Sequence, residues 1–551
     1  MPVQSAIRSF VRVVTVAGGV FAPGHLGELT QWVPFELVDD LLEQARAVQR
    51  RVRDLPTRAG VYFVLALALF ADDSYRDVWD HLVAGLRDLP GLRVAHPSGQ
   101  ALGQLRRRVG VGPVRALFET VAGPLAGPRT PGAYYRHWRT VAFDGCNSLK
   151  TPEVHRSWLG HARRWLGLPG YPTVMLVALV ETGTRAIMAA VFGPGVSAGN
   201  GEINYARRLS GHLHAGLLVL GDRAYDNDEF LKRVALQAKA QFLVRVKCTR
   251  RLQVLTLLPD GSFLSLLDGL PVRVIEAWIT ARDRHGAVVA ADRYRLVTTL
   301  TDHRTDPAAR LVQLYHERWE IESAYYALRH TLLHARVLRS RVPALLEQEL
   351  WALLTVYQLL RTAMVEATDA IGADPDRACF TTALNTARDQ TVTATGILPA
   401  TDPATGRATL TTTIARIVQD NLLPPRRPRI SARKVKCPTS RYAIRPATDD
   451  RPLTSTDITD IEINIEEPAL PDHPDPLTTG TARPHGLTPV LDILATDPDR
   501  AWHARDIASH LGETNINSIA SRLSRWAAKG KLHKINRATY RLRPLNPSMV
   551  T

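Results

Sequence analysis

The sequence predicts a multi-domain α/β protein, with a helical N-terminal domain, a mixed-sheet core that carries a β-rich insertion, and a small C-terminal domain of helices and a hairpin. Three observations lead to this fold class. The 551-residue chain is longer than a single hydrophobic core supports. Its hydrophobic share of 45% and charged share of 22% are typical of a folded protein. The spacing of apolar residues changes from helical to strand-like near residue 136 and returns to helical near residue 301.

Charge and cysteine usage narrow the class of partner. Lys and Arg number 69 against 53 Asp and Glu, a formal charge of +16, which favours nucleic acid as a partner, although an Arg-rich proteome explains the same surplus. The four cysteines lie far apart and predict neither a disulfide framework nor a zinc site. Apolar runs such as VYFVLALALF (61–70) are too short to cross a bilayer, so we expect a cytoplasmic protein without membrane association.

Residues 1–135 predict a helical domain, which we expect to serve in DNA binding or dimerisation. Its segments ELVDDLLEQARAVQRRVRDL and TRAGVYFVLALALF carry apolar residues at helical spacing. Two shorter helices broken by Gly110 and Gly112 suggest a helix-turn-helix. The run Arg106, Arg107 and Arg108 is compatible with phosphate contact, and equally with a solvated helix face.

Residues 136–248 predict the first part of the core. RTVAFDG, VMLVALVET and AIMAAVFGPG read as three successive strands, and a helix, the strand GLLVLG, a helix and the strand AQFLVRV follow. A three-strand meander followed by αβα matches the opening of an RNase H-like core. Residues 249–300 predict a β-rich insertion with DG and RHG turns, and residues 301–423 the C-terminal helical part of the core.

Residues 424–484 read as a linker that is first basic, from Arg426 to Lys436, and then acidic with little periodicity. Residues 485–551 predict three helices and a two-stranded wing, the pattern of a winged helix-turn-helix. Its third helix carries a polar and basic face, including Arg522 and Arg525, that suits a reader of the DNA major groove. Winged helices also mediate protein contacts, so that alternative stays open.

Two aspartates lie where apolar strands are expected to end. Asp144 follows VAF and precedes Gly145, and Asp222 follows LLVLG. Carboxylates at neighbouring strand ends can converge on a hard divalent cation such as Mg²⁺. Taken singly, however, a strand-end Asp is more often a turn former or a helix cap.

The segment YHERWEIESAYYALR predicts a continuous helix with a polar face. Four residues at spacings of three, four and seven make up that face: Tyr315, Arg318, Glu322 and Arg329. The alternative is a salt-bridged amphipathic helix in which Trp319, Tyr326 and Leu333 pack inward. Spacing alone does not exclude that alternative.

The order of three motifs carries a resemblance to a known family. AFDGCNSLKTPE, LVLGDRAYDN and YHERWEIESAYYALR resemble the first-Asp strand, second-Asp strand and Glu helix of transposases of the insertion-sequence-four (IS4) family. That family carries a DDE triad and a Tyr-x2-Arg-x3-Glu-x6-Lys signature. The segment from LTQWVPFELVDD to YRDVWDHL also resembles the family's N-terminal domain, so the resemblance spans roughly residues 20–360.

The resemblance implies a function and a set of site residues. Asp144, Asp222 and Glu322 would be the catalytic triad and would hold two Mg²⁺ ions, with Mn²⁺ as an alternative. Tyr315, Arg318 and Arg329 would bind DNA, and Arg329 stands where the family has Lys. The implied partners are double-stranded DNA, both terminal inverted repeats and target, and a second copy of the chain in a homodimer. The implied location is the bacterial cytoplasm, at the nucleoid.

We therefore expect a DNA transposase that moves an insertion sequence by cut-and-paste strand cleavage and strand transfer. Two alternatives are a catalytically decayed, transposase-derived DNA-binding regulator and a metal-dependent nuclease without strand transfer. Glu202 has two readings as well, as an assistant to the metal site or as a first-turn acid that favours a helix dipole, and we leave it outside the triad.

Overall fold

The computed structural model describes the following residues: 20–21, 24–48, 55–87, 93–159, 170–195, 201–247, 250–283, 285–286, 288–395, 400–401, 408–409, 413–425, 458–468, 487–498, 500–511, 516–528, 531–536 and 539–541. The chain divides into two units, Met1–Ala469 and Leu470–Thr551, which are treated separately. In these described residues no helix combines the length and the apolar character needed to cross a membrane. The basic stretch predicted from Arg426 to Lys436 lies outside the described residues.

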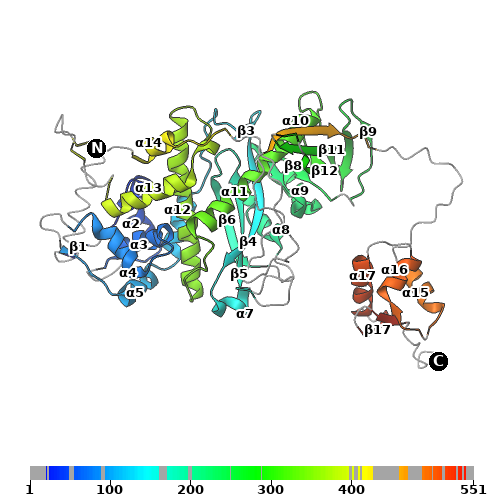
Figure 1. The fold of residues 1–551 in the computed structure, drawn as a ribbon, viewed down its shortest axis with the longest axis horizontal. Helices are drawn as coiled ribbons and strands as arrows, with labels where there is room; N and C mark the ends of the chain where they lie inside the picture. The colour runs from blue at the N-terminus through cyan, green and yellow to red at the C-terminus, as the bar shows by residue number, and fades with distance from the viewer. Residues whose placement is uncertain are drawn as a thin grey trace. The chain divides into compact units, whose positions relative to one another are not determined.

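A mixed sheet runs through the first unit, and eleven strands of the described residues belong to it (Figure 1). Its first five strands in spatial order are β6 (Ile187–Pro194), β5 (Thr173–Glu181), β4 (Trp138–Lys150), β7 (Leu217–Gly221) and β8 (Gln241–Arg245). Strands β4, β5 and β6 form an antiparallel meander, whereas β4, β7 and β8 run parallel. The predicted meander and the two strands predicted after it are confirmed, and the structure adds that those two strands run parallel to β4.

The two faces of this sheet enter two separate hydrophobic clusters. Ala142 of β4 joins one cluster, and its neighbours Val141 and Phe143 join the other, because successive strand residues point to opposite faces. The first cluster includes residues of α10 (Ala308–Tyr315), α11 (Glu320–Tyr326) and α12 (Pro343–Asp369). The second includes residues of α8 (Glu202–Arg208) and α9 (Asp228–Lys232). We call these the α11 face and the α8 face of the sheet.

The β-rich segment extends the same sheet. Its strands are β12 (Val288–Thr298), β11 (Leu270–Asp283), β10 (Phe263–Leu267) and β9 (Thr256–Leu257), in that spatial order after β8. Strand β12 pairs antiparallel with β8, with Leu296 opposite Arg245. The β-rich segment that follows β8 is therefore hydrogen-bonded to the core sheet through β12.

A further strand lies inside the stretch that the sequence analysis interpreted as a linker. Strand β15 (Ile458–Ile465) pairs antiparallel with the second half of β11, with Ile465 opposite Ala277. The sequence DIEINI alternates apolar and polar residues, which is the strand period. The linker interpretation overlooked this short signal, because polar and Pro-rich residues surround it.

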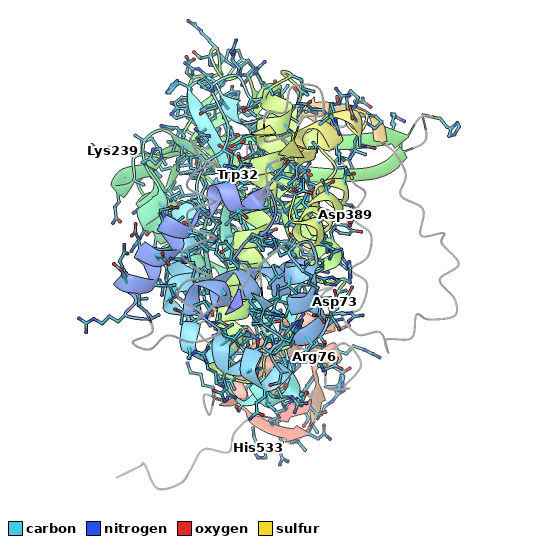
Figure 2. The ribbon with its side chains drawn as sticks, turned by 90° about the vertical axis from the view of Figure 1, so that its left-hand side faces the viewer. Trp32, Asp73, Arg76, Lys239, Asp389 and His533 are labelled. Carbon is cyan, nitrogen blue, oxygen red and sulfur yellow. The ribbon has the colours of Figure 1, made fainter. Side chains whose placement is uncertain are left out.

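The N-terminal part of the first unit is helical, as predicted. Its helices are η1 (Leu29–Trp32), α2 (Phe35–Gln44), α3 (Thr57–Leu69), α4 (Tyr75–Ala84), α5 (Gly99–Val109) and α6 (Gly112–Val121). Helix α3 is buried along nearly its whole length and packs with α6 around α12. At the surface, the indole of Trp32, labelled in Figure 2, donates a hydrogen bond to Glu366 of α12 at 3.2 Å. The long α12 thus joins the helical domain to the sheet.

Two arginines of the run in α5, Arg106 and Arg108, make hydrogen bonds within the protein. Arg106 is fully buried and donates to Gln348 at 3.0 Å and to Ser340 at 3.1 Å. Arg108 donates to the carbonyl of Leu55 at 3.0 Å. The prediction of phosphate contact is wrong for Arg106, because its guanidinium is committed to the joint between α5 and α12.

Short elements complete the described part of the first unit. The remaining strands are β1 (Val20–Phe21), β2 (Arg93–Val94), β3 (Tyr134–Tyr135), β13 (Ala400–Thr401) and β14 (Ala408–Thr409). Apart from two turns beside α11 that are described with the site, the remaining helices and turns are η2 (Glu153–His155), α7 (Arg156–Leu159), η3 (Ser210–His212), η4 (Arg223–Tyr225), η5 (Arg233–Gln237), η8 (Pro375–Arg377), α13 (Phe380–Thr393) and α14 (Thr413–Asp420). Helices α13 and α14 pack against α12.

The second unit contains three helices and a small antiparallel sheet. Its elements are α15 (Leu487–Ala495), β16 (Trp502–His503), α16 (Ala504–His510), α17 (Ile516–Ala528), β17 (His533–Asn536) and β18 (Thr539–Arg541). Strand β18 lies between β16 and β17. Apolar residues such as Val490, Ile507 and Leu523 form its own core. The predicted helices and hairpin are present, together with a third short strand.

Candidate active site

Asp144 and Asp222 lie side by side on neighbouring parallel strands. The β4–β7 ladder ends with Ala142 opposite Leu220, so each aspartate lies two residues beyond the last pair on its own strand. Asp222 follows the last residue of β7, as predicted. Asp144 does not end its strand, because β4 continues to Lys150 in partnership with β5. The prediction that the strand ends at Asp144 is therefore wrong for β4. Only the pairing of β4 with β7 ends near Asp144.

Strand alternation directs both aspartates to the α11 face. Ala142 and Leu220 belong to the hydrophobic cluster of that face, and residues two positions further along a strand point the same way. Each carboxyl is oriented by a nearby backbone N–H: Gly145 donates to Asp144 at 2.8 Å, and Ala224 donates to Asp222 at 2.7 Å. Their free sides therefore face helix α11.

The segment with Tyr315, Arg318, Glu322 and Arg329 is helical but changes its pitch. Helix α10 ends at Tyr315, a 3₁₀ turn η6 (His316–Trp319) follows, then α11, and then a π turn η7 (Ala327–Leu332). The predicted continuous α-helix is thus wrong in detail. Short 3₁₀ and π stretches within a helix often mark functional positions.

Three of the four signature residues lie close together. Arg318 lies 5.9 Å from the ring centre of Tyr315, and its Nη2 is 3.4 Å from a carboxylate oxygen of Glu322. Arg329, on the π turn, instead has its Nη2 2.9 Å from Nε2 of His330. Tyr326 is 63% exposed, so the alternative in which it packs inward is wrong for that residue.

Tyr325 fixes helix α11 to the strand that carries Asp144. Its hydroxyl donates to the carbonyl of Asp144 at 2.7 Å and accepts from the N–H of Ala178 on β5 at 3.1 Å. Glu322 precedes Tyr325 by one helical turn and so lies on the same side of α11. Sequence reasoning missed this residue, because a Tyr at helical spacing reads as ordinary core.

The three carboxylates act on one another electrostatically. The pKa of Asp144 is raised from 3.8 to about 7, first by burial and then by the charges of Asp222 and Glu322, against the lowering effect of Arg318. Part of the surface of Asp144 is accessible to solvent. Protein atoms nevertheless surround its carboxyl group closely, and burial is the largest cause of the raised pKa. A bound cation would stabilise the charged form of Asp144.

Arg318 is the cation nearest this cluster. Burial alone would lower its pKa, but Tyr315, Asp144, Glu322 and Asp222 together raise the pKa above its ordinary value. The guanidinium lies 4.8 Å from the ring centre of Trp319. Its Nε is buried and has no hydrogen-bond partner among the described residues. Arg318 is thus held between aromatic rings with donor capacity to spare.

A second arginine lies on the other side of Asp222 and was not anticipated from the sequence. Gly221 pairs with Val244 in the parallel β7–β8 ladder, so Arg245 is the neighbour of Asp222 one step on. Its guanidinium lies 4.2 Å from the ring centre of Tyr294 and donates to Asp292 at 2.8 Å. The register of two distant strands places it there, which local sequence patterns do not show.

The donor set fits a divalent metal ion. Three carboxylates offer the oxygen ligands that hard divalent cations prefer. In the described part of the chain, no group of three or more Asp, Glu, His or Cys side chains is arranged closely enough to enclose an ion. The carboxylate of Glu322 instead lies 3.4 Å from Nη2 of Arg318.

Known proteins match this chain over both its helical and its sheet-containing parts. The family described as insertion element 4 transposase N-terminal matches residues 23–119, and the transposase DDE domain family matches residues 148–359. The second match includes Asp222 and Glu322 and begins just after Asp144. The transposase InsG for insertion sequence element IS4, from Escherichia coli (strain K12), is 28% identical over 437 residues, which cover 76% of this chain and 94% of that protein.

These matches define a class and then a family. The chain is a DDE transposase, an enzyme that cleaves DNA. It belongs to the IS4 family of these transposases. DDE transposases use divalent metal ions and act on DNA. A cryo-EM structure of a piggyBac transposase synaptic complex with hairpin DNA is also similar, with a TM-score of 0.36 and 10% identity over 74% of this chain and 87% of that chain. That level of similarity adds nothing to the assignment.

Proposed function

We propose that Asp144, Asp222 and Glu322 are the catalytic triad and hold two Mg²⁺ ions for cut-and-paste transposition of an insertion sequence. The observation that carries this proposal is the shared level of Asp144 and Asp222 on neighbouring strands, with the Glu322 helix fixed to the same point by Tyr325. Mn²⁺, which also accepts carboxylate oxygens, is the expected substitute.

The chain's own residues would prepare the site for this chemistry. When bound, the ions supply activation of the attacking oxygen and stabilisation of the leaving oxygen in an in-line displacement at phosphorus. Asp144 and Asp222 are fixed by the sheet and oriented by backbone N–H groups, so their positions cost little reorganisation. Glu322 would exchange its pairing with Arg318 for a metal ion. Arg318 would then be released toward a phosphate.

Three residues remain the proposed DNA contacts: Tyr315, Arg318 and Arg329. Tyr315 is 2% exposed and Arg318 is 6% exposed, so contact requires DNA to enter beside the helix or the helix to shift. Arg329 is already partly accessible. A guanidinium binds phosphate as a planar fork, and Arg318 has an unused donor for that purpose.

We further propose an assignment for the remaining parts. The strand order β6-β5-β4-β7-β8 supports an RNase H-like core that includes the segments 136–248 and 301–423, with 249–300 as its insertion. The helical residues 1–135 would bind DNA or mediate a homodimer on paired element ends. Residues 485–551 would act as a winged helix on DNA, and the linker predicted at 424–484 would be limited to its parts outside β15, which belongs to the sheet. The expected location is the nucleoid of the bacterial cytoplasm.

The test is a cleavage and joining assay on DNA that carries the inverted repeats flanking this gene. Wild-type protein is expected to cut and join in Mg²⁺ or Mn²⁺ and to bind without cutting in EDTA. Asp144→Asn, Asp222→Asn and Glu322→Gln should each bind the ends without cutting. Glu229→Gln is a suitable control, because this carboxylate is 64% exposed on α9 and pairs with Arg207.

Each contrary result has a defined meaning. Cleavage at wild-type rate by any of the three variants removes that residue from the triad. Cleavage without joining by the wild-type protein would assign a nuclease, and specific end binding with neither reaction would assign a regulator. Loss of activity in Glu229→Gln would show that the assay responds to general damage.

A further inference from the structure

A glutamate from the opposite face of the sheet packs against the backbone beside Asp144. Glu202 is the first residue of α8, and Gly145 follows Asp144 on β4. A Cβ atom added to Gly145 would lie 2.5 Å from Cγ and Cδ of Glu202 and 2.8 Å from its Oε1. Real Cβ atoms do not approach other atoms so closely, so Gly145 is required for this contact. The glutamate therefore lies directly against the strand at the triad.

The sheet topology makes room for this approach. The β4–β7 ladder ends at Ala142, and β4 continues without that neighbour past Gly145. Helix α8 packs on the α8 face of the sheet, where Tyr205 and Ala206 enter the hydrophobic cluster. Glu322 belongs to the other face. The two glutamates therefore reach the neighbourhood of Asp144 from opposite sides of the sheet.

The charge of Glu202 acts on the same group as the triad. Three carboxylates, those of Asp222, Glu322 and Glu202, add to the raised pKa of Asp144, and Arg318 acts against them. Negative charges gathered in a poorly hydrated place repel one another at a cost that a bound cation removes. The first-turn position of Glu202 in α8 does not by itself require it to lie against Gly145.

An independent observation points to a ligand at this place. Tyr225 is fully buried, and its hydroxyl has no hydrogen-bond partner among the residues that the structure describes. The ring of Tyr225 stacks on that of Phe143, the residue before Asp144, with the ring centres 5.9 Å apart, and η4, which carries Tyr225, packs against α8, which carries Glu202. Burial raises the pKa of Tyr225, and the charges of Asp144 and Glu202 raise it further. Buried hydroxyl groups nearly always have a partner. A metal-bound water or a metal-bound carboxylate would supply one.

We propose that Glu202 is a fourth carboxylate of the metal centre, which binds the same ion as Asp144 from the α8 face while the Tyr225 hydroxyl donates to a ligand of that ion. This inference rests on the proposed function, because it presupposes a metal held by Asp144. It assigns a role to Gly145 as well, whose missing side chain allows Glu202 to approach.

The experiment measures Mn²⁺ binding to the full chain by electron paramagnetic resonance, without DNA, for wild type, Glu202→Gln, Glu202→Asp, Asp144→Asn and Glu229→Gln. Loss of a group that only hydrogen-bonds a metal ligand typically weakens metal binding by roughly 10- to 100-fold, and loss of a direct carboxylate ligand should weaken it at least as much. We expect that loss in Glu202→Gln, a smaller loss in Glu202→Asp, and wild-type binding in Glu229→Gln. Tyr225→Phe should weaken binding less than Glu202→Gln.

The outcomes separate this inference from the proposed function. Wild-type Mn²⁺ affinity in Glu202→Gln, together with a loss in Asp144→Asn, overturns the role of Glu202 and leaves the triad intact. Wild-type affinity in Asp144→Asn overturns the triad itself. Thermal unfolding in EDTA tells whether each variant is folded. If Glu202→Gln is unfolded, Glu202→Asp decides: weakened binding supports the inference, and unchanged binding overturns it.

Discussion

Two acidic side chains on the β4–β5 strand pair differ in their surroundings. Glu181, at the end of β5, is fully buried and pairs in register with Val141. Asp144 pairs with Ala178, three residues further along β4. The two carboxylates thus belong to the same pair of strands, one at the end near the helical domain and one at the candidate active site.

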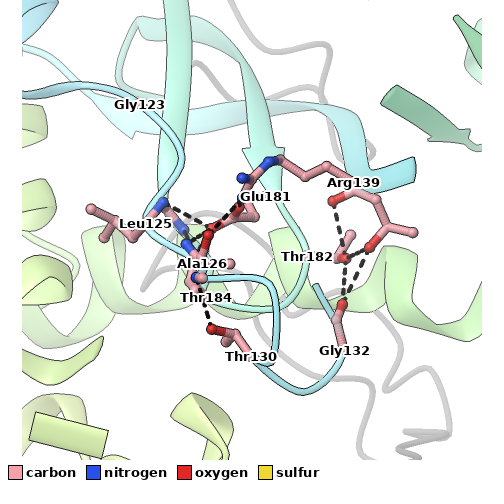
Figure 3. Close-up of polar contacts among 12 residues, drawn as sticks. Gly123, Leu125, Ala126, Thr130, Gly132, Arg139, Glu181, Thr182 and Thr184 are labelled. Carbon is pink, nitrogen blue, oxygen red and sulfur yellow. Dashed lines mark hydrogen bonds and ion pairs between the residues drawn. The ribbon is translucent and has the colours of Figure 1, made fainter. Parts of the chain in front are cut away.

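The surroundings of Glu181 satisfy it completely. Its Oε2 accepts hydrogen bonds from the N–H groups of Leu125 and Ala126, both at 3.0 Å, and from the hydroxyl of Thr184 (Figure 3). Its Oε1 forms an ion pair with Arg139. The carboxylate therefore ties the loop that follows α6 to the sheet.

The surroundings of Asp144 disfavour its charged form. Its neighbours are mainly other carboxylates, and its pKa is raised to about 7 where burial is the leading cause. Removing a buried carboxylate that has matched partners destabilises the fold, whereas a carboxylate surrounded by like charge itself destabilises the fold until a cation binds. The contrast separates a structural carboxylate from a functional one without reference to relatives.

The largest expected effect is on cleavage by Asp144→Asn. Loss of a metal ligand removes several kcal/mol of transition-state stabilisation, so the rate should fall by roughly 10³-fold or more. The metal-free protein should instead become more stable, because the substitution removes repulsion with Asp222, Glu322 and Glu202. Single-turnover cleavage and urea unfolding in EDTA measure the two effects.

The gain in stability should depend on pH. A raised pKa means that the folded state keeps a proton that the unfolded state has released, so the wild type loses stability as pH rises from about 4 to about 7. The advantage of Asp144→Asn should therefore be absent near pH 4 and reach roughly 2–4 kcal/mol above pH 7. An equal difference at both pH values would contradict the origin assigned to the pKa shift.

The second prediction is that a substitution at Glu181 lowers stability and leaves cleavage unchanged, the opposite of Asp144→Asn. Glu181→Gln leaves the partly buried Arg139 without its counter-charge, and breaking an ion pair of this kind typically costs about 3–5 kcal/mol of unfolding free energy. Cleavage per folded molecule should stay near wild type. The control is Glu119→Gln, since its pairing with Arg115 is exposed and should cost at most about 1 kcal/mol. If Glu181→Gln were as stable as wild type, Glu181 would not be the anchor described here.

The third prediction concerns Tyr325, which links the two kinds of role. Tyr325→Phe leaves the Ala178 N–H without its acceptor and should cost about 1–3 kcal/mol of stability. Cleavage should also fall, by about tenfold or more, because small displacements of a catalytic group are expensive. The matched control is Tyr326→Phe at the next position, where the ring is 63% exposed. Equal behaviour of the two variants would remove the positioning role of Tyr325.

Local sequence patterns predicted much of this fold. The apolar runs of β5 and β7 predicted the buried strands, and Asp222 follows its strand as expected, whereas β4 continues beyond its predicted end to Lys150. The helical spacing before residue 136 gave the N-terminal helices correctly. These features depend on short stretches of chain, where side-chain periodicity decides the structure.

Features that depend on pairing between distant segments were not predictable. Asp144 lies inside β4 because β5 continues to pair with that strand after β7 has left it. Arg245 joins the site through the β7–β8 register, and Glu202 through the path of α8. The 3₁₀ and π turns around α11 also escaped prediction, because a spacing of three, four and seven residues fits a straight α-helix equally well.

The smallest expected effect is that of Arg329→Lys, which restores the residue typical of the family. Arg329 is partly exposed and its recorded contact is with the neighbouring His330, so unfolding free energy should change by no more than about 0.5 kcal/mol. If this position holds a phosphate, Lys keeps the charge but not the planar fork, and end binding should change only a few-fold. Arg329→Ala should weaken binding more than Arg329→Lys and should lessen its salt dependence, because one cationic contact is lost. Equal affinity of all three proteins across a salt titration would place Arg329 outside the DNA interface and confine the site's cationic contacts to the neighbourhood of Arg318.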